Sequence, residues 1–165
     1  MNELNEFGGV FLLECFDKNG KLKWADEVHN LTVNEGLQHI LDVAFAGGTQ
    51  VNPWYIGLTD GSPTPSAADT MSSHAGWSEV VAYSEATREE YVDVRSGQSV
   101  TNSASPASFS INGSATVGGA FLSSNNVKSG TSGTLLAVAA LSGGNRSAAD
   151  GDTINVTYNF TGAAS

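Results

Sequence analysis

The stretch TINVTYNFT (residues 153–161) has the clearest structural pattern in the chain, because apolar and polar side chains alternate along it. Its apolar positions are Ile154, Val156, Tyr158 and Phe160, which share one side of an extended strand. Strand-like runs precede it at residues 107–112, 118–123 and 134–141, with Ser-, Gly- and Asn-rich turns between them. Strands at this spacing, without an intervening helix, predict a mainly β protein with an antiparallel β-sandwich or barrel-like fold.

The charged residues are concentrated in the first part of the chain. Among 7 basic and 17 acidic side chains, those beyond residue 96 are Lys128, Arg146, Asp150 and Asp152. An enzyme needs titratable groups around a pocket, so this distribution favours a structural or binding protein over a catalyst. Because the cores of protein interfaces are depleted in charge, we expect the neutral second half to pack against another protein.

Length and net charge further limit what kind of protein this chain forms. A chain of 165 residues predicts a single β-rich domain spanning residues 1–165. The net charge of -10 argues against nucleic acid as a partner, because phosphate binding requires a basic surface. The single cysteine, Cys15, is expected to be a small core residue. Neither a secretory signal nor a membrane-spanning run is apparent, which predicts synthesis in a cytoplasm and no membrane partner.

An N-terminal β-hairpin is predicted around Asn19-Gly20, between strands at residues 10–16 and 21–28. A two-residue loop places Lys18 opposite Lys21. The same register pairs Phe11 with Val28, Leu13 with Asp26 and Cys15 with Trp24, so these residues and Leu22 share one face. This face is expected to be buried, and Asp26 is its misfit.

One amphipathic helix is predicted at about residues 33–46. Thr32 and Glu35 have capping-box spacing, and Gly47-Gly48 ends the pattern. Gly36 in the first turns suggests a close backbone approach. The helix is expected to lie on the hairpin, which gives a structural core of Trp24, Leu37, Ile40, Leu41, Phe45, Trp54 and Ile56, the last two from a strand at residues 54–58. Leu41→Ala is therefore expected to cost about 2–5 kcal/mol as a core truncation.

The connection at residues 62–78 is longer than most loops, and we expect an ordered surface excursion held down by Trp77. Residues 79–95 predict an irregular, charged edge region.

Candidate catalytic and metal-binding groups are few. His29, His39 and His74 are scattered without metal-ligand spacing, and Asp150 with Asp152 lacks the remaining ligands of a calcium loop. The acidic residues Glu85, Glu89, Glu90 and Asp93 would suit a glycosidase only if two of them converged, and such runs are usually solvated. We therefore predict no catalytic residue, no metal site and no cofactor.

Six segments resemble a recurrent small virion protein of tailed bacteriophages. They are the hairpin ending in Lys23-Trp24, NLTVNEGL (30–37), WYIGL (54–58), ADTMSSHAGW (68–77), YSEATR (83–88) and GDTINVTY (151–158). The resemblance spans nearly the whole chain, and it implies a structural protein without enzymatic activity or cofactor. It does not specify the location in the particle.

Between capsid and tail, small size and a neutral β half favour a decoration (cement) protein on the outer capsid surface, with the major capsid protein as partner. The resemblance further implies a homo-oligomer, with a trimer as the expected state, in a virion assembled in the bacterial host cytoplasm. A tail or tail-fibre component that contacts the host is the alternative, and a glycan-degrading hydrolase module is the third.

The N-terminal residues 1–7 are predicted to form a flexible arm before a Gly8-Gly9 hinge. Asn2, Leu4 and Phe7 are the expected capsid contacts, since apolar side chains there lie among polar neighbours.

Overall fold

A computed structural model describes residues 7–162 of the chain. In these residues, β-strands dominate and no helix is long and apolar enough to cross a bilayer. The elements are β1 (Phe7–Phe16), β2 (Leu22–His29), β3 (Leu31–Thr32), α1 (Asn34–Phe45), β4 (Tyr55–Thr59), β5 (Glu79–Val80), β6 (Glu89–Glu90), β7 (Val94–Ser96), β8 (Ser99–Thr101), β9 (Ala107–Ser110), β10 (Ala115–Val117), β11 (Gly119–Ser123), β12 (Leu135–Ala140), β13 (Arg146–Ala148) and β14 (Thr153–Gly162).

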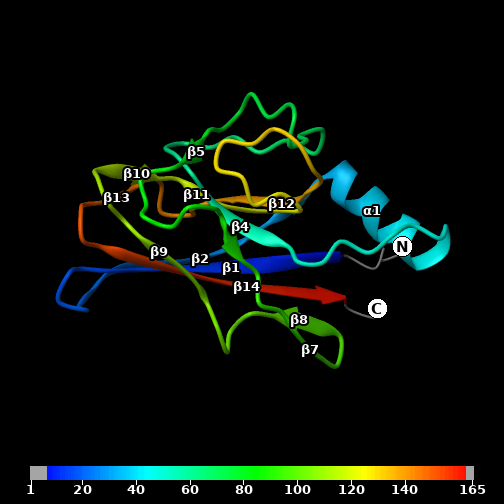
Figure 1. Ribbon diagram of the computed structural model, residues 1–165, viewed down its shortest axis with the longest axis horizontal. Coiled ribbons are helices and arrows are strands. Elements are labelled where there is room, and N and C mark those ends of the chain that lie inside the picture. Colours follow the sequence, from blue (N-terminus) through cyan, green and yellow to red (C-terminus); the bar gives the residue numbers. More distant parts are fainter. Residues whose placement is uncertain (1–6, 163–165) are drawn as a thin grey trace.

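Two six-stranded antiparallel sheets form the body of the molecule (Figure 1). Sheet A has the order β2-β1-β14-β8-β7, with β9 also paired to β14. Sheet B has the order β3-β12-β11-β4-β5, with β6 also paired to β4, and β10 pairs separately with β13. The predicted mainly β, antiparallel sandwich-like fold is confirmed.

The main core lies between the two sheets. Side chains of the alternating strand at residues 153–161 meet those of β1 on sheet A and those of β4, β11 and β12 on sheet B. Fully buried members include Phe11, Leu13, Ile56, Leu58, Ala120, Ile154, Val156 and Tyr158. The alternation in β14 therefore reflects a strand that buries one face against sheet B.

A second cluster covers the outer face of sheet B. Its members are Val33, Met71, Trp77, Phe121, Leu135 and Val138. Trp77 packs on Phe121 with ring centroids 4.9 Å apart, so the connection at residues 62–78 is an ordered excursion held by Trp77, as predicted. The apolar runs of the neutral second half are thus buried on both faces of the chain's own sheet. The apolar runs are therefore internal, and the expectation that the neutral second half packs against another protein stays a prediction about its exposed polar surface.

The hairpin has the predicted register over most of its length, with Phe11, Leu13 and Cys15 opposite Val28, Asp26 and Trp24. The predicted two-residue turn is wrong. A bulge after Cys15 shifts the register and pairs Phe16 with Leu22. The wider turn forms because the Asp17 carboxylate accepts hydrogen bonds from two backbone N–H groups across it, those of Asn19 and Lys21. Leu22 consequently lies at the exposed end, with 49% of its surface accessible.

Helix α1 begins at Asn34, and the predicted capping box is absent. Thr32 belongs to β3, and its hydroxyl donates to the carbonyl of Phe7. The Glu35 carboxylate instead accepts a hydrogen bond from the backbone N–H of Leu135 at 2.8 Å. Thr32 and Glu35, which the local spacing predicts as helix caps, therefore form hydrogen bonds with residues distant in sequence instead. The helix ends as predicted before Gly47, which has a φ of 73°.

The predicted cluster between helix and hairpin is also wrong, because α1 packs against β12 instead. Trp24 is half-buried at the hairpin's turn end, where its indole N–H donates to the carbonyl of Ser147. Leu41 and Phe45 are exposed to 53% and 86% and do not belong to the core. The remaining predicted core residues are Leu37 and Ile40, both half-buried, Trp54, half-buried against the core, and Ile56, fully buried.

Phe7 is part of β1 and pairs with Gly162, so the predicted arm of residues 1–7 does not include it. The predicted Gly8-Gly9 hinge is likewise inside the strand. Gly9 is needed for packing, because a Cβ there would lie 2.6 Å from the Tyr158 ring. Asn2 and Leu4 lie outside the described residues.

Two identical substitutions test the position of the helix. Leu58 is fully buried between the sheets, so Leu58→Ala is expected to cost about 2–5 kcal/mol of unfolding free energy. Leu41→Ala, at the exposed position, is expected to cost less than about 1 kcal/mol. Urea denaturation of both variants measures the difference, and equal losses would contradict the observed orientation of α1.

Candidate binding surface

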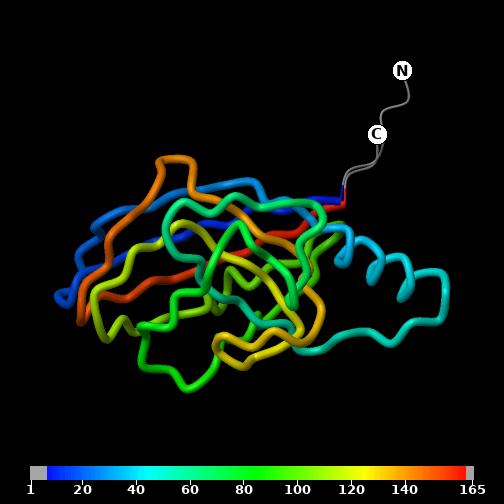
Figure 2. Tube along the Cα trace, turned by 90° about the horizontal axis from the view of Figure 1, so that it is seen from above, coloured from blue at the N-terminus to red at the C-terminus, as the bar shows by residue number. Residues whose placement is uncertain are grey.

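Helix α1 is attached to the sandwich through its first turn. Besides the Glu35 bond, the backbone N–H groups of Val33 and Asn34 donate to the carbonyls of Leu136 and Ala67 at 3.2 and 2.8 Å. Gly36 is buried directly against the backbone of Leu136, where any side chain would collide. The suggested close backbone approach at Gly36 is therefore confirmed. Beyond this turn, the helix extends past the end of the sandwich (Figure 2).

The side of α1 opposite Gly36 is exposed, and two large apolar side chains lie there among polar ones. Successive helix positions are about 100° apart, which places Phe45 roughly half a turn around the axis from Gly36, with Leu41 nearby. We call Leu41 and Phe45 the outer ridge. The apolar stripe that the sequence predicts is thus only half covered by the sandwich, because contact with β12 turns one flank of the stripe inward and leaves the other uncovered.

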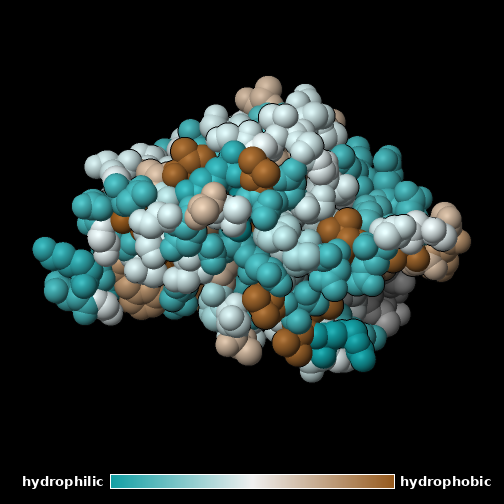
Figure 3. Space-filling view, viewed as in Figure 1, coloured by the Kyte–Doolittle hydropathy of each residue, from teal (hydrophilic) through white to brown (hydrophobic). Residues whose placement is uncertain are grey.

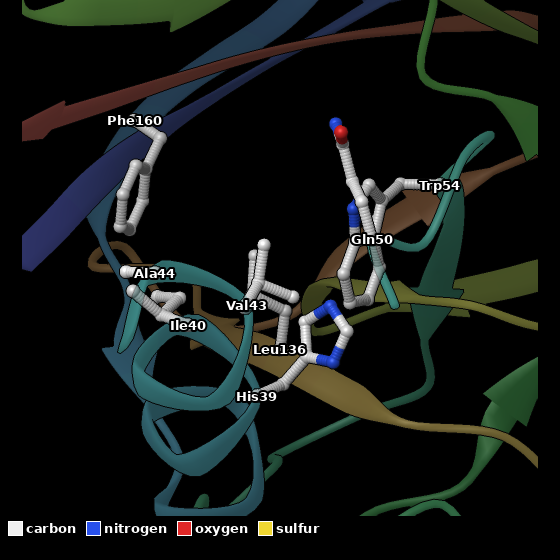
Figure 4. Close-up of a pocket in the computed structure, with 8 residues that line it drawn as sticks. All are labelled: His39, Ile40, Val43, Ala44, Gln50, Trp54, Leu136 and Phe160. Atoms are coloured by element: carbon white, nitrogen blue, oxygen red, sulfur yellow. The ribbon is translucent and has the colours of Figure 1, made fainter. Parts of the chain in front are cut away.

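The inward side of α1 borders an apolar groove of about 310 Å³. This end groove is lined by His39, Ile40, Val43, Ala44, Gln50, Trp54, Leu136 and Phe160. The rings of Phe160 and Trp54 stand on opposite sides of it, with the helix side chains between them (Figure 4). His39 packs edge-on against Trp54 with ring centroids 5.4 Å apart. His39 is the one ionisable side chain of the lining, so an apolar ligand group would meet no charged carboxylate, ammonium or guanidinium there.

The end groove continues the inner face of sheet A beyond the main core. Phe160 follows Tyr158 on the inward side of β14, and the ring of Phe7 stacks on it at 6.4 Å. Phe7 is 47% exposed, so an aromatic surface extends from the groove to the first described residue. On the face shown in Figure 3, apolar residues otherwise form small patches among polar ones. This end of the molecule therefore combines the outer ridge, the end groove and Phe7.

Arg88 forms a buried cluster that the sequence analysis missed. Its side chain is 1% exposed, and it forms a two-pronged ion pair with the Glu79 carboxylate at 2.9 and 2.8 Å. The other guanidinium donors reach the Ser123 hydroxyl and the carbonyls of Asn125 and Gly130. Glu79 also accepts the N–H of Ser129. We call these contacts the Arg88 clamp; they hold the loop at residues 124–133 against sheet B. Its partners are distant in sequence, so no local pattern indicates it.

Two further ion pairs hold the hairpin to the second half. Asp26, the predicted misfit, accepts hydrogen bonds from the Ser142 hydroxyl and the Gly143 N–H and lies 3.5 Å from the Arg146 guanidinium. Asp152 pairs with Lys23 and accepts the N–H of Ala149.

Burial alone would raise the pKa of the Asp152 carboxyl. The hydrogen bonds from Lys23 and Ala149 nevertheless leave that pKa below its ordinary value. Burial, together with the Asp152 charge, raises the pKa of the Cys15 thiol to about 11, so Cys15 is a protonated core residue, as predicted from its single occurrence.

The three histidines lie apart. His29 is exposed on β2, and His39 lines the end groove. His74 stacks on Trp77 with centroids 3.8 Å apart, and its Nδ1 lies 3.0 Å from the Trp77 carbonyl. Within residues 7–162, no three His, Cys, Asp or Glu side chains are grouped as metal ligands.

The acidic side chains considered as glycosidase carboxylates lie mainly at the edge of a sheet. Glu90 and Asp93 are exposed, and both carboxylate oxygens of Glu85 accept the backbone N–H of Ser110. Burial and then the neighbouring charge of Glu85 raise the pKa of Glu89, while Lys128 opposes the shift. Glu85 is therefore held as a structural acceptor beside Glu89. Asp150 is exposed in the final turn.

Comparison with protein-family models gives no match for the chain, and comparison with curated proteins gives no significant similarity.

The Arg88 clamp predicts a specific loss of stability. Glu79→Gln keeps the shape of the side chain but leaves the buried guanidinium without a counter-charge, which is expected to cost about 3–5 kcal/mol. Urea denaturation measures this loss, and Glu90→Gln, at an exposed carboxylate, is the control. A loss of less than about 1 kcal/mol for Glu79→Gln would show that the ion pair is dispensable.

The Asp152 interactions predict a pH dependence. Because the folded-state pKa is lowered, their contribution is complete above the unfolded value of 3.8 and is lost as the pH falls through the folded-state value. Asp152→Asn is therefore expected to flatten the decline in unfolding free energy between about pH 5 and pH 3. Asp150→Asn, which removes an exposed carboxylate from the same turn, is the control, and identical slopes for the two variants would contradict the assignment.

Proposed function

We propose that this protein is a non-enzymatic structural component of a tailed-phage virion, and specifically a decoration protein bound to the outer capsid surface. The observation that supports this role best is the uncovered apolar end of the sandwich, formed by the outer ridge, the end groove and Phe7. Exposed apolar surface gathered in one region is typical of a protein-binding site. The resemblance to phage virion proteins along nearly the whole chain supports the same class.

The proposed partner is the major capsid protein, and the proposed state is a homo-oligomer, with a trimer as the expected form. On a capsid lattice, several modest contacts act together, because attachment of one subunit raises the effective concentration of the next. The apolar end is a better candidate for these contacts than the neutral second half, whose apolar strands are enclosed between the main core and the second cluster.

Capsid contact is proposed to begin at Phe7 and to include Asn2 and Leu4, which precede it in the chain. Phe7 lies at the apolar end of β1, and Leu22, a residue of similar exposure, lies at the opposite end of the same hairpin. The two positions allow a contact at the apolar end to be separated from a general effect of exposed apolar surface.

A tail or tail-fibre component would use the same apolar end to bind a different virion protein, so this alternative stays open. For the glycan-degrading module, the pair with the most suitable electrostatics is Glu89 beside Glu85. The hydrogen bonds from Ser110 to Glu85 favour a structural role for that pair, and this candidate ranks last.

The test is binding to phage heads assembled without this protein. The intact chain is expected to sediment with expanded heads and to leave isolated capsid subunits free. A variant that starts at Phe7 after an initiator Met, and a Phe7→Ser variant, are each expected to bind about tenfold more weakly. Leu22→Ser is the matched control and should bind as the intact chain does.

Unchanged binding by both altered variants would remove the N-terminal end from the interface. Failure of the intact chain to bind heads, combined with its detection on tails, would replace the decoration role with the tail role. Release of reducing sugar from host glycans that depends on Glu89 would support the hydrolase instead.

A further inference from the structure

The chain contains two Asn-Gly pairs, Asn19-Gly20 and Asn112-Gly113, and both asparagines are exposed. In such a pair the backbone nitrogen of the glycine can attack the side-chain amide of the asparagine, because glycine has no Cβ to hinder the approach. The attack needs a glycine nitrogen that is free to lose its proton and to move toward the asparagine Cγ. The hydrogen bonds of the two turns differ in this respect.

The hairpin turn at Asn19-Gly20 is held closed. The Gly20 N–H donates to the carbonyl of Asp17 at 2.8 Å. The Asp17 carboxylate also accepts the N–H groups of Asn19 and Lys21, at 2.8 and 3.0 Å. These bonds keep the proton on the Gly20 nitrogen and fix the backbone on both sides of Asn19. Attack on the Asn19 side chain therefore requires the turn to open first.

The turn at Asn112-Gly113, between β9 and β10, is less constrained. The Asn112 N–H donates to the carbonyl of Ala82 at 3.1 Å, whereas the Gly113 N–H has no acceptor among residues 7–162. Gly113 also lies outside the left-handed region, and a Cβ built on it would be 3.9 Å from the nearest atom, the Ala82 Cβ. The attacking nitrogen is thus free, and the space around it is open.

We propose that Asn112 is a site of spontaneous deamidation in the folded protein, while Asn19 is protected. The Gly113 nitrogen loses its proton and bonds to the Asn112 Cγ. The Cγ–Nδ2 bond breaks, and Nδ2 leaves as ammonia with that proton. Water then opens the resulting succinimide ring, either at Cγ, which gives aspartate, or at the backbone carbonyl carbon, which gives isoaspartate. The reaction consumes water and releases ammonia, and it requires neither an oxidant nor a reductant.

Deamidation would add a negative charge to a chain whose net charge is already -10. The charge would lie beside the final turn, because the N–H of the neighbouring Ile111 donates to the carbonyl of Asp152 and its carbonyl accepts the N–H of Gly151. That turn already contains the carboxylates of Asp150 and Asp152. The site is at the end of the sandwich away from α1, so the modification is separate from the proposed capsid contact (Figure 1).

Peptide mapping by mass spectrometry, after incubation of the full chain at mildly alkaline pH, tests this proposal. Each conversion replaces an amide NH2 group by OH, and fragment masses assign it to a residue. In the folded chain, Asn112 is expected to convert about tenfold faster than Asn19, since release of a single backbone hydrogen bond changes a rate by about that factor. In guanidinium chloride, where both turns are lost, the two asparagines are expected to convert at similar rates.

Two variants test the physical cause. Gly113→Ala has room for its methyl group and an ordinary backbone conformation, so it is expected to fold and to slow the conversion of Asn112. Asp17→Ala removes the carboxylate that holds the hairpin turn, and it is expected to speed the conversion of Asn19 without changing that of Asn112.

Three outcomes would overturn the proposal. They are conversion of Asn19 as fast as that of Asn112 in the folded chain, no conversion of Asn112 there while the unfolded chain converts, and an unchanged rate at Asn112 in Gly113→Ala. Because no phage heads are present, these outcomes are independent of whether the protein decorates a capsid.

Discussion

The antiparallel ladder between β1 and β14 joins the two ends of the described chain, and the rest of the sandwich depends on it. It runs from the pair Phe7–Gly162 to the pair Phe16–Thr153. β14 also pairs with β8 and β9, so most of sheet A is assembled on this one strand. The inward side chains of the ladder form one half of the main core. Its open end places Phe7 and Phe160 beside the end groove, which connects the central structural element to the candidate binding surface.

Sheet B is stabilised differently, because it is buried on both faces. The long excursion at residues 62–78 covers its outer face, and the Arg88 clamp secures the neighbouring loop. The clamp places a buried charge from the charged first half among hydroxyl and carbonyl acceptors of the neutral second half. All five guanidinium N–H donors have acceptors, and this saturation is the condition under which a charge is tolerated in an interior.

Helix α1 is attached to the sandwich through its first turn, and its groove-lining flank lies beside Phe160, on which the proposed capsid contact Phe7 stacks. Formation of the proposed homo-oligomer would bring several N-terminal ends together, and each would add a modest contact to the lattice. The ion pairs that join the hairpin to the second half lie toward the other end, where Leu22 serves as the control position.

The local patterns can be read from the order of the amino acids alone. The alternation of Ile154, Val156, Tyr158 and Phe160 identified a strand with one buried face, and the hairpin's apolar positions specified most of its register. These patterns are readable because side-chain direction follows backbone period. Which flank of the α1 stripe is covered follows from the assembled fold, since it depends on where Gly36 meets Leu136. The burial of Arg88 also follows from the assembled fold, because the acceptors that make it possible come from residues 79–130 and converge only when the sheets assemble.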